Sequence, residues 1–329
     1  MSQIQKFLFD GLPVRGVAVR LTDAWQEVVQ RRAANTESGP YPAPVVQLLG
    51  EMTAAAVLMQ SNIKFNGALI LQMQGDGPVK VTVAEVQPSL AVRATASIVG
   101  EVTPGAGLVQ LVNQHGAGKC AITLDPKDRL PGQQAYQGVV PLADEHGAPL
   151  VHVADVLQHY MRQSEQLDTT LVLAANDQVA AGILIQRLPL EGEANLAGST
   201  AAPTDEAREE AAESYNRIVT LAQSLQQQEL LELDIDTILH RLFWDEKLLR
   251  FMPSSSDPVP HFACTCSHER VAAMLRNLGK EEADAIVAEQ GLIEVGCEFC
   301  GRQYQFDKVE VAQLFKPAAA QPPGSDAVH

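Results

Sequence analysis

The sequence predicts an α+β fold with an N-terminal domain of mixed helices and sheet, a helical linker and a small C-terminal zinc-binding domain. Several β-like stretches follow one another before a helical pattern intervenes, which favours α+β over a doubly wound parallel sheet. Amphipathic helical patterns come next, and two close pairs of cysteines lie near the C-terminus. We expect the domains to span residues 1–190, 191–256 and 257–316, followed by a disordered tail at 317–329.

Length and composition restrict the class of protein. A chain of 329 residues corresponds to about two domains, and its 46% content of hydrophobic residues excludes a wholly disordered chain. The first eleven residues mix Gln3, Lys6 and Asp10 with apolar side chains, so they lack the apolar core of a signal peptide. No window approaches about 18 uninterrupted apolar residues. We therefore expect a cytoplasmic protein without a membrane partner, in which thiols stay reduced.

Charge is distributed unevenly along the chain. There are 40 acidic and 24 basic residues, which gives a net charge of −16. Residues 1–190 carry 13 basic and 16 acidic side chains (−3), whereas residues 191–329 carry 11 and 24 (−13). Such a chain repels a nucleic-acid backbone unless a local basic patch overrides the net charge, and the sequence contains no such patch. We therefore expect no nucleic-acid partner.

The N-terminal domain contains a clear hairpin signal. Residues 68–74 are β-prone, residues 75–78 (Gly-Asp-Gly-Pro) are strong turn formers, and Val79, Val81 and Val83 then alternate with polar residues. Further strands are expected at residues 91–99, 120–124, 136–142, 171–174 and 183–188, and helices at residues 45–60 and 150–164.

The second segment changes character. Residues 191–204 are rich in Gly, Ala, Ser and Thr, which is typical of a flexible surface loop. Helical spacing follows at Ile218, Leu221, Ala222 and Leu225, and again after the expected N-cap Asp234 at Ile235, Ile238, Leu239, Leu242 and Phe243. Helices of this kind need a partner surface. Two interpretations remain open: permanent packing on the first domain, or a linker that docks only under some conditions.

The last segment carries the chemistry. Cys264 and Cys266 form one close pair, and Cys297 and Cys300 form a second pair. Four thiolates complete a tetrahedral zinc site, although one intervening residue is fewer than the two to four that usually separate paired ligands. Gly301 suits the tight turn of a zinc knuckle. His261 and His268 are the alternative ligands, but histidines beside a metal site are more often surface or supporting groups.

The residues between the two pairs predict two short helices. Val271, Met274, Leu275 and Leu278 mark the first helix, which Gly279 ends, and residues 281–289 form the second, which ends before Gly291. So short a segment builds little core, and structural zinc contributes roughly 10–16 kcal/mol of binding energy that is also folding energy. We expect the module to unfold when the metal is lost.

The chain resembles the redox-regulated holdase chaperones of the 33-kDa heat-shock family. In the cysteine region the resemblance rests on residues 264–267, 269–270 and 293–300, with Tyr304 and Phe306. Upstream it rests, in the same order as in the family, on residues 14–16, 64–65, 67, 74–78, 136–140, 160–166, 181–182 and 186–189. The sequence departs from the family at a long loop near residues 193–212 and in the tail after Pro317.

The resemblance implies a post-translational switch rather than an enzyme. It implies that the reduced protein holds one zinc ion through Cys264, Cys266, Cys297 and Cys300 and is poorly active. Oxidation by peroxide together with mild unfolding, or by hypochlorous acid, would join Cys264 to Cys266 and Cys297 to Cys300, release the zinc and unfold the module. Apolar surface would then bind partly unfolded client proteins without ATP and prevent their aggregation under oxidative stress, and family members form homodimers when active.

Three alternatives stay open at this point. The first alternative is that the module is an inert zinc ribbon. The second is a zinc ribbon that serves a nucleic-acid or transcription partner, and the third is a thiol oxidoreductase that uses Cys297 and Cys300.

Cys120 lies outside the quartet and is expected to be a buried core thiol. Residues 116–119 (Gly-Ala-Gly-Lys) lack the full spacing of a phosphate loop and predict a turn. Tyr160, Arg162 and Glu165 mark either an exposed ridge or a solvated helix end.

Overall fold

The computed structural model describes residues 1–35, 38–129, 132–189, 204–252, 254 and 256–316. The chain forms two compact units, Met1–Ala263 and Cys264–His329. The first unit therefore includes the described linker residues and the segment 257–263, which the sequence analysis assigned to the zinc-binding domain. The four-part division made from the sequence stays a prediction, and the expected disordered tail at 317–329 lies outside the described residues.

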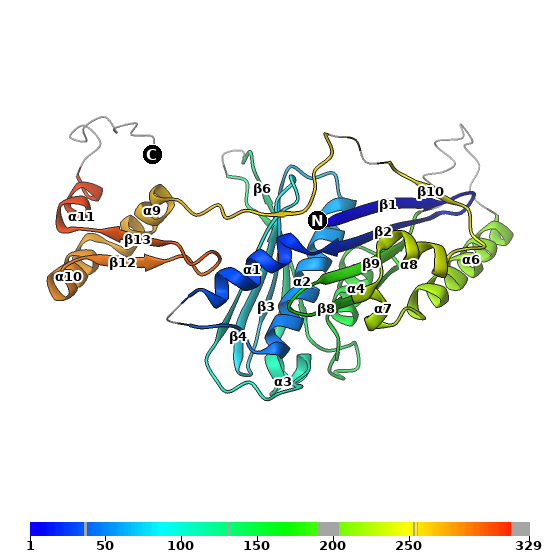
Figure 1. The fold of residues 1–329 in the computed structure, drawn as a ribbon, viewed down its shortest axis with the longest axis horizontal. Coiled ribbons are helices and arrows are strands. Elements are labelled where there is room, and N and C mark those ends of the chain that lie inside the picture. Colours follow the sequence, from blue (N-terminus) through cyan, green and yellow to red (C-terminus); the bar gives the residue numbers. More distant parts are fainter. Residues whose placement is uncertain (36–37, 130–131, 190–203, 253, 255, 317–329) are drawn as a thin grey trace. The chain divides into compact units, whose positions relative to one another are not determined.

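Two sheets form the body of the first unit (Figure 1). The five-stranded sheet has the order β10-β1-β2-β9-β8 and consists of β1 (Gln3–Phe9), β2 (Val14–Leu21), β8 (Thr169–Ala175), β9 (Ala180–Arg187) and β10 (Leu248–Arg250). The six-stranded sheet has the order β11-β5-β4-β3-β6-β7 and consists of β3 (Gly67–Gln74), β4 (Val79–Val86), β5 (Ala91–Ile98), β6 (Lys119–Pro126), β7 (Tyr136–Pro141) and β11 (His261–Phe262).

These strands confirm the α+β class and most of the expected elements. The predicted hairpin is β3–β4, whose antiparallel register runs from Leu69 opposite Val86 to Gln74 opposite Val81. Strands β5 to β9 each overlap a predicted stretch. Strands β1 and β2 were not predicted. Most of β2 is buried, so its sequence lacks the alternation of apolar and polar residues that marks a half-exposed strand.

Helix α2 (Ala43–Asn62) is the central element of the first unit. It begins directly after Pro42, contacts strands of both sheets and has 15 buried residues among its 20. Within the described part of the chain it is the one helix long and apolar enough to cross a membrane, and 83% of that apolar window is buried inside the fold. A core helix of a globular domain has the same properties, and the larger apolar cluster of the unit surrounds α2.

Three further helices precede the linker in the first unit. They are α1 (Asp23–Ala33), α3 (Leu108–Val112) and α4 (Val153–Ser164). Helix α4 confirms the helix expected at residues 150–164, and α2 confirms the one expected at residues 45–60. Helix α1 was not predicted; it buries Trp25, whose indole Nε1 donates a hydrogen bond to the backbone oxygen of Asn176 at 2.7 Å.

Helices from the second half of the chain cover the other face of the five-stranded sheet. They are α6 (Asp205–Gln223), α7 (Gln227–Glu232) and α8 (Ile235–Leu242), and they bury Ile218, Leu239 and Phe243 against Phe7 and Phe9. Rings of Phe9 and Phe243 meet edge to face with centroids 5.0 Å apart. In the described structure the helices are therefore docked, and whether they also undock is a question of function.

The first residues of α8 and α6 test two predictions made from the sequence. The N-cap Asp234 is confirmed, because its side chain accepts a hydrogen bond from the backbone N–H of Thr237. The extended loop near residues 193–212 is wrong in its second half, because α6 already begins at Asp205. Residues 205–212 are rich in Ala and Glu, which are strong helix formers. Residues 190–203 lie outside the described residues.

The second unit is a small two-stranded sheet with three helices. Its elements are α9 (His268–Leu278), α10 (Lys280–Gln290), β12 (Ile293–Gly296), β13 (Gln303–Phe306) and α11 (Lys308–Leu314). Helices α9 and α10 confirm the two expected helices, which end at Gly279 and Gly291, both with positive φ. The buried face of α9 differs from the expected one, because Ala272 and Leu275 are buried whereas Met274 and Leu278 are each 49% exposed.

A glycine in β2 permits the aromatic packing under the docked helices. Gly16 lies directly opposite Phe7, and a Cβ atom added to Gly16 would lie 2.2 Å from the Phe7 ring. We predict that Gly16→Ala lowers the free energy of unfolding by about 1–3 kcal/mol, because the ring must move within a packed core. Urea denaturation of the zinc-loaded protein measures the change. In a Phe7→Leu background the same substitution should cost clearly less, and an equal cost in both backgrounds would contradict the clash.

Candidate metal centre

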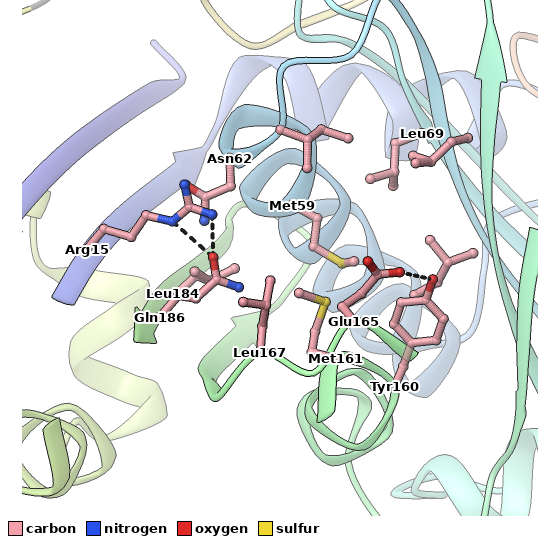
Figure 2. A pocket seen from close by; sticks show the side chains of 13 residues that line it. Arg15, Met59, Asn62, Leu69, Tyr160, Met161, Glu165, Leu167, Leu184 and Gln186 are labelled. Atoms are coloured by element: carbon pink, nitrogen blue, oxygen red, sulfur yellow. Dashed lines mark hydrogen bonds between the residues drawn. The ribbon is translucent and has the colours of Figure 1, made fainter. Parts of the chain in front are cut away.

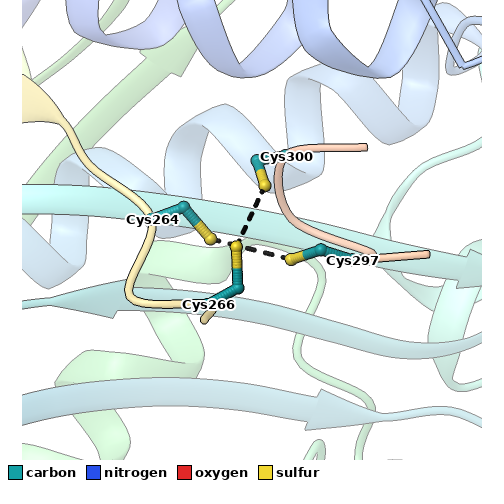
Figure 3. Close-up of side chains that lie close together, drawn as sticks. All are labelled: Cys264, Cys266, Cys297 and Cys300. Atoms are coloured by element: carbon teal, nitrogen blue, oxygen red, sulfur yellow. Dashed lines mark hydrogen bonds between the residues drawn. The ribbon is translucent and has the colours of Figure 1, made fainter. Parts of the chain in front are cut away.

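Two loops of the second unit carry the four cysteines (Figure 3). Cys264 and Cys266 lie between β11 and α9, and Ser267 then caps α9 by accepting a hydrogen bond from the backbone N–H of Arg270. Cys297 and Cys300 lie in the turn between β12 and β13. Gly301 closes this turn with φ of +72°, and its N–H donates to the backbone oxygen of Cys297 at 2.8 Å. The tight turn expected at Gly301 is therefore confirmed.

The four sulfur atoms converge on one point. All four Sγ atoms lie within 4.8 Å of one another, with Cys264 and Cys297 at 3.6 Å and Cys266 and Cys300 at 3.4 Å. A metal ion bound tetrahedrally at about 2.3 Å from each sulfur implies sulfur separations of about 3.8 Å. A disulfide would need about 2.05 Å, so these are four separate thiols. The cluster fits a four-thiolate metal site.

Hydrogen bonds make the four thiols unequal. Burial opposes ionisation of Cys266, but the Tyr304 hydroxyl donates to its Sγ at 3.1 Å, and with the neighbouring thiols this lowers the pKa of Cys266 to about 7. Burial raises the pKa of Cys297 and of Cys300, although backbone N–H groups oppose the shift at both. Before a metal binds, Cys266 therefore ionises more readily than Cys297 and Cys300.

The guanidinium of Arg302 lies near this cluster of sulfur atoms. The pKa of the Arg302 guanidinium is raised, first by its hydrogen bond with the Tyr304 side chain and then by the charge that Tyr304, Cys266 and Cys300 carry when they are ionised. A four-thiolate site with one divalent ion carries a net charge of −2, so a neighbouring guanidinium offsets part of it. No role was predicted for Arg302 from the sequence. The contact of Tyr304 with Cys266 could have been anticipated, because Tyr304 lies on the strand that follows the second cysteine pair.

The core beneath the cysteines is small. Its buried apolar residues are Ala272, Leu275, Ala283, Val287, Ile293, Tyr304, Phe306 and Val311. Phe306 is fully buried and His268 stacks on it, with ring centroids 4.3 Å apart. A core of this size rarely stabilises an independent unit without a metal or disulfides.

Neither histidine joins the sulfur cluster. His268 faces Phe306 and lies 3.9 Å from Glu310, and His261 has its Nδ1 2.9 Å from the backbone oxygen of Val259. Among the described residues, the group with metal-binding geometry consists of the four cysteines. The expectation that the histidines are supporting or surface groups agrees with this arrangement.

The remaining sequence candidates lie in the first unit. Cys120 is confirmed as a core thiol: it is fully buried in β6, and burial raises its pKa to about 12.

The prediction that Tyr160 marks an exposed ridge is wrong, because Tyr160 is 2% exposed and its hydroxyl donates to Glu165 at 3.0 Å. Arg162 and Glu165 are exposed at the end of α4, as expected of a solvated helix end. The turn predicted at residues 116–119 lies slightly earlier: the N–H of Gly116 donates to the backbone oxygen of Asn113 at 3.3 Å, and β6 already begins at Lys119.

Comparisons with known proteins point in one direction. The family model described as "Hsp33 protein" matches residues 2–307. The 33 kDa chaperonin of Chromobacterium violaceum is 42% identical over 314 residues, which cover 95% of this chain and 94% of that protein. The 33 kDa chaperonin of Methylobacillus flagellatus is 38% identical over 329 residues, which cover 100% of this chain and 99% of that protein.

A solved structure shares the fold. The crystal structure of a 33 kDa chaperonin from Thermotoga maritima, described as a heat shock protein 33 homolog, superposes with a TM-score of 0.69. The match covers 94% of this chain and 97% of the other, at 19% sequence identity. At this identity the match speaks for the fold alone.

The Tyr304 hydroxyl generates a prediction about metal affinity. Tyr304→Phe removes the hydrogen bond to Cys266, so the thiolate loses a stabilising donor, and we expect zinc to bind about tenfold more weakly. Competition with a chromophoric chelator measures the affinity. Tyr136→Phe removes a hydroxyl from an exposed tyrosine of the first unit and is the matched control. Equal affinity in the wild type and Tyr304→Phe would show that this bond does not stabilise the thiolate.

Proposed function

The chain belongs to the Hsp33 family, a family of chaperones, and from this premise we propose that it is a redox-regulated, ATP-independent holdase. In the reduced state it holds one zinc ion and is poorly active. Oxidation of the cysteines activates it to bind unfolding proteins and prevent their aggregation. The observation that carries the proposal is the convergence of four thiols within 4.8 Å in a unit with a very small core.

Zinc is the metal we propose for this site. Four cysteine sulfurs in tetrahedral arrangement are typical of structural zinc or of iron–sulfur sites, and a closed four-sulfur site leaves no position for a substrate. Cys264, Cys266, Cys297 and Cys300 would hold the ion, with Tyr304 supporting Cys266 through its hydroxyl. When bound, zinc supplies charge compensation for the thiolates and most of the folding energy of the unit.

Oxidation is proposed to form two disulfides. Two thiolates give up two electrons as one S–S bond forms, and one hydrogen peroxide takes these electrons with two protons from solvent to become two water molecules. The family resemblance assigns the bonds Cys264–Cys266 and Cys297–Cys300. In the described structure the closest sulfurs are those of Cys264 with Cys297 and Cys266 with Cys300, so distance alone does not choose a pairing. Disulfide sulfurs bind zinc poorly, so both pairings lead to loss of the metal.

Loss of the metal is proposed to act on the linker through the chain itself. Cys264 follows β11 after a single residue, and β11 is held on the edge of β5 by backbone hydrogen bonds from His261 to Leu90 and from Ala263 to Val92, each 3.2 Å long. The Phe262 ring lies 4.7 Å from the guanidinium carbon of Arg31. An unfolded second unit exerts no constraint on this short strand, which frees the chain that leads back to α8.

The helices of the linker offer the apolar surface. Helices α6 to α8 bury Ile218, Leu239 and Phe243 on the five-stranded sheet, and undocking would expose both these residues and the sheet face beneath them. The segment after α8 already displays apolar side chains, with Trp244 at 73% and Met252 at 83% exposure. Unfolding clients are recognised by such apolar surface without nucleotide chemistry.

Partners and location follow the same proposal. We propose unfolded or partly unfolded proteins as clients, a homodimer as the active oxidised form and the cytoplasm as the compartment, where reduced thiols are the resting state. The net charge of −13 in residues 191–329 disfavours a nucleic-acid partner. The raised pKa values of Cys297 and Cys300 disfavour a thiol oxidoreductase, because the attacking thiol of such an enzyme needs a lowered pKa.

The switch predicts different behaviour of two preparations. Light scattering follows a heat-unfolding client mixed with reduced, zinc-loaded protein or with peroxide-treated protein, while a zinc indicator records released metal. We expect aggregation to be suppressed only after oxidation, with about one zinc ion released per chain, as one four-ligand site requires. Peptide mapping of the oxidised protein then identifies the disulfide pairs.

Two variants test the origin of the effect. Replacing all four clustered cysteines by serine should abolish zinc binding and the response to peroxide, whereas Cys120→Ala should leave both intact because Cys120 is buried outside the cluster. Equal client protection by the reduced and oxidised wild type, with zinc retained, would favour the inert zinc ribbon. Catalytic turnover of a dithiol substrate would favour the oxidoreductase.

The docked helices generate a second prediction. Leu239→Ala removes a fully buried side chain of α8, which should cost about 2–5 kcal/mol of packing and loosen the helices from the sheet. We expect this variant to suppress client aggregation partly while still reduced and zinc-loaded. Leu157→Ala in α4 is the matched control, because Leu157 is equally buried but belongs to the larger cluster around α2. Equal activation by both variants would show that general destabilisation, rather than undocking, exposes the client-binding surface.

A further inference from the structure

A second site lies in the first unit, in a cavity to which the redox proposal assigns no role. The cavity of about 100 Å³ lies where β2, β3, β6 and β9 approach the end of α2 and the end of α4 (Figure 2). Residues from three segments that are distant in sequence meet there: Arg15, Tyr160 to Glu165, and Gln186. These segments are among those that carry the family resemblance.

A chain of hydrogen bonds fixes the guanidinium of Arg15. Gln186 is 2% exposed, and its Nε2 donates to Thr169 Oγ1 at 2.8 Å, so its Oε1 faces the other way. That oxygen accepts hydrogen bonds from Nε of Arg15, at 2.9 Å, and from Nη2 of Arg15. The antiparallel register places Arg15 directly opposite Gln186. The guanidinium is therefore held in one orientation before any ligand arrives.

Two hydrogen-bond donors at this end of the cavity have no acceptor. Within the described part of the chain, Nη1 of Arg15 has no hydrogen bond and Arg15 has no carboxylate within ion-pair distance. Nδ2 of Asn62, at the end of α2, is buried and has no hydrogen-bond partner. Burial lowers the pKa of Arg15, as expected of a cation without a counter-ion. An unpaired buried donor is costly, so the buried Nδ2 of Asn62 indicates a missing acceptor at this end of the cavity, which the half-buried Arg15 also lines.

The rest of the cavity is apolar and carries one negative charge. Its apolar lining includes Met59, Leu69, Leu124, Met161, Leu167 and Leu184. Figure 2 shows Arg15, Asn62 and Gln186 grouped on one side and Tyr160 with Glu165 on the other, with Met59, Met161 and Leu167 between them. The Glu165 carboxylate accepts the hydrogen bond of Tyr160 and repels an anion at that end.

We propose that this cavity binds a small aliphatic monocarboxylate. The carboxylate is received by the guanidinium of Arg15 and the amide N–H of Asn62, and the hydrocarbon chain lies among the methionine and leucine side chains. The cavity volume of about 100 Å³ limits the hydrocarbon part of the ligand to a short chain. A dicarboxylate is excluded because its second charge would meet the apolar wall or Glu165.

Calorimetric titration of the full-length, reduced, zinc-loaded protein with hexanoate tests the site. We expect saturable binding with one site per chain, at least tenfold tighter than that of hexanol, which lacks the charge, and of adipate, which carries a second one. Asn62→Asp is the decisive variant, because an isosteric carboxylate beside Arg15 supplies the missing acceptor within the chain. Hexanoate should then bind at least tenfold more weakly, while the thermal unfolding midpoint rises.

Further variants separate the site from nonspecific effects. Arg15→Met should also lose hexanoate binding. Lys80→Gln removes one exposed cation on β4 and is the matched control, with wild-type binding expected. Hexanoate binding no tighter than hexanol binding, or unchanged affinity in Asn62→Asp, overturns the proposal even where Arg15→Met fails to fold. The four-serine variant of the cysteine cluster should bind hexanoate normally, so failure of the redox proposal and failure of this one are distinguishable.

Discussion

The closeness of four cysteine sulfurs is the constraint on which the second unit depends. Four sulfurs within 4.8 Å cannot all carry charge unless a cation lies among them, and Arg302 alone does not balance them. The surrounding core consists of eight buried side chains, so the electrostatics of the cluster outweigh its packing. Two local turns create the arrangement, one before α9 and one closed by Gly301. Under the redox proposal, the four thiols that hold the unit together would also make it sensitive to oxidants.

The first unit depends on a different interaction, the burial of α2. This helix contacts both sheets, and the large apolar cluster forms around it without help from the linker helices. The cavity with Arg15 and Asn62 lies at the end of α2, where the helix stops at Asn62. Polar side chains are tolerated in the interior there because they bond to one another and to the backbone. Gln186 donates to the Thr169 hydroxyl, and that hydroxyl donates to the backbone oxygen of Leu167.

The sequence predicted features that depend on neighbours in the chain. The cysteine pairs, the turn at Gly301, the helix ends at Gly279 and Gly291 and the N-cap Asp234 all rest on local spacing. Features set by distant partners were missed. The pairing of Arg15 with Gln186 joins residues 171 positions apart, the burial of Tyr160 depends on strands packed over α4, and β2 lacks alternation because most of its residues are buried. The start of α6 was missed because a gap in family resemblance was interpreted as a gap in structure.

The five-stranded sheet has apolar clusters on both of its faces. Val17 and Val19 of β2 belong to the cluster around α2, whereas Val14 and Ala18 belong to the cluster under the docked helices. The same sheet thus contributes to two apolar cores. The hydrogen bonds that pair β2 with β1 and β9 are formed between strands and do not involve the helices that pack on either face. If the docked helices leave the sheet as proposed, the loss of this outer core would be a partial unfolding event with a heat-capacity change set by the outer layer alone. Such an event would keep the pairing of β1, β2, β9 and β8 and present one face of these strands to solvent.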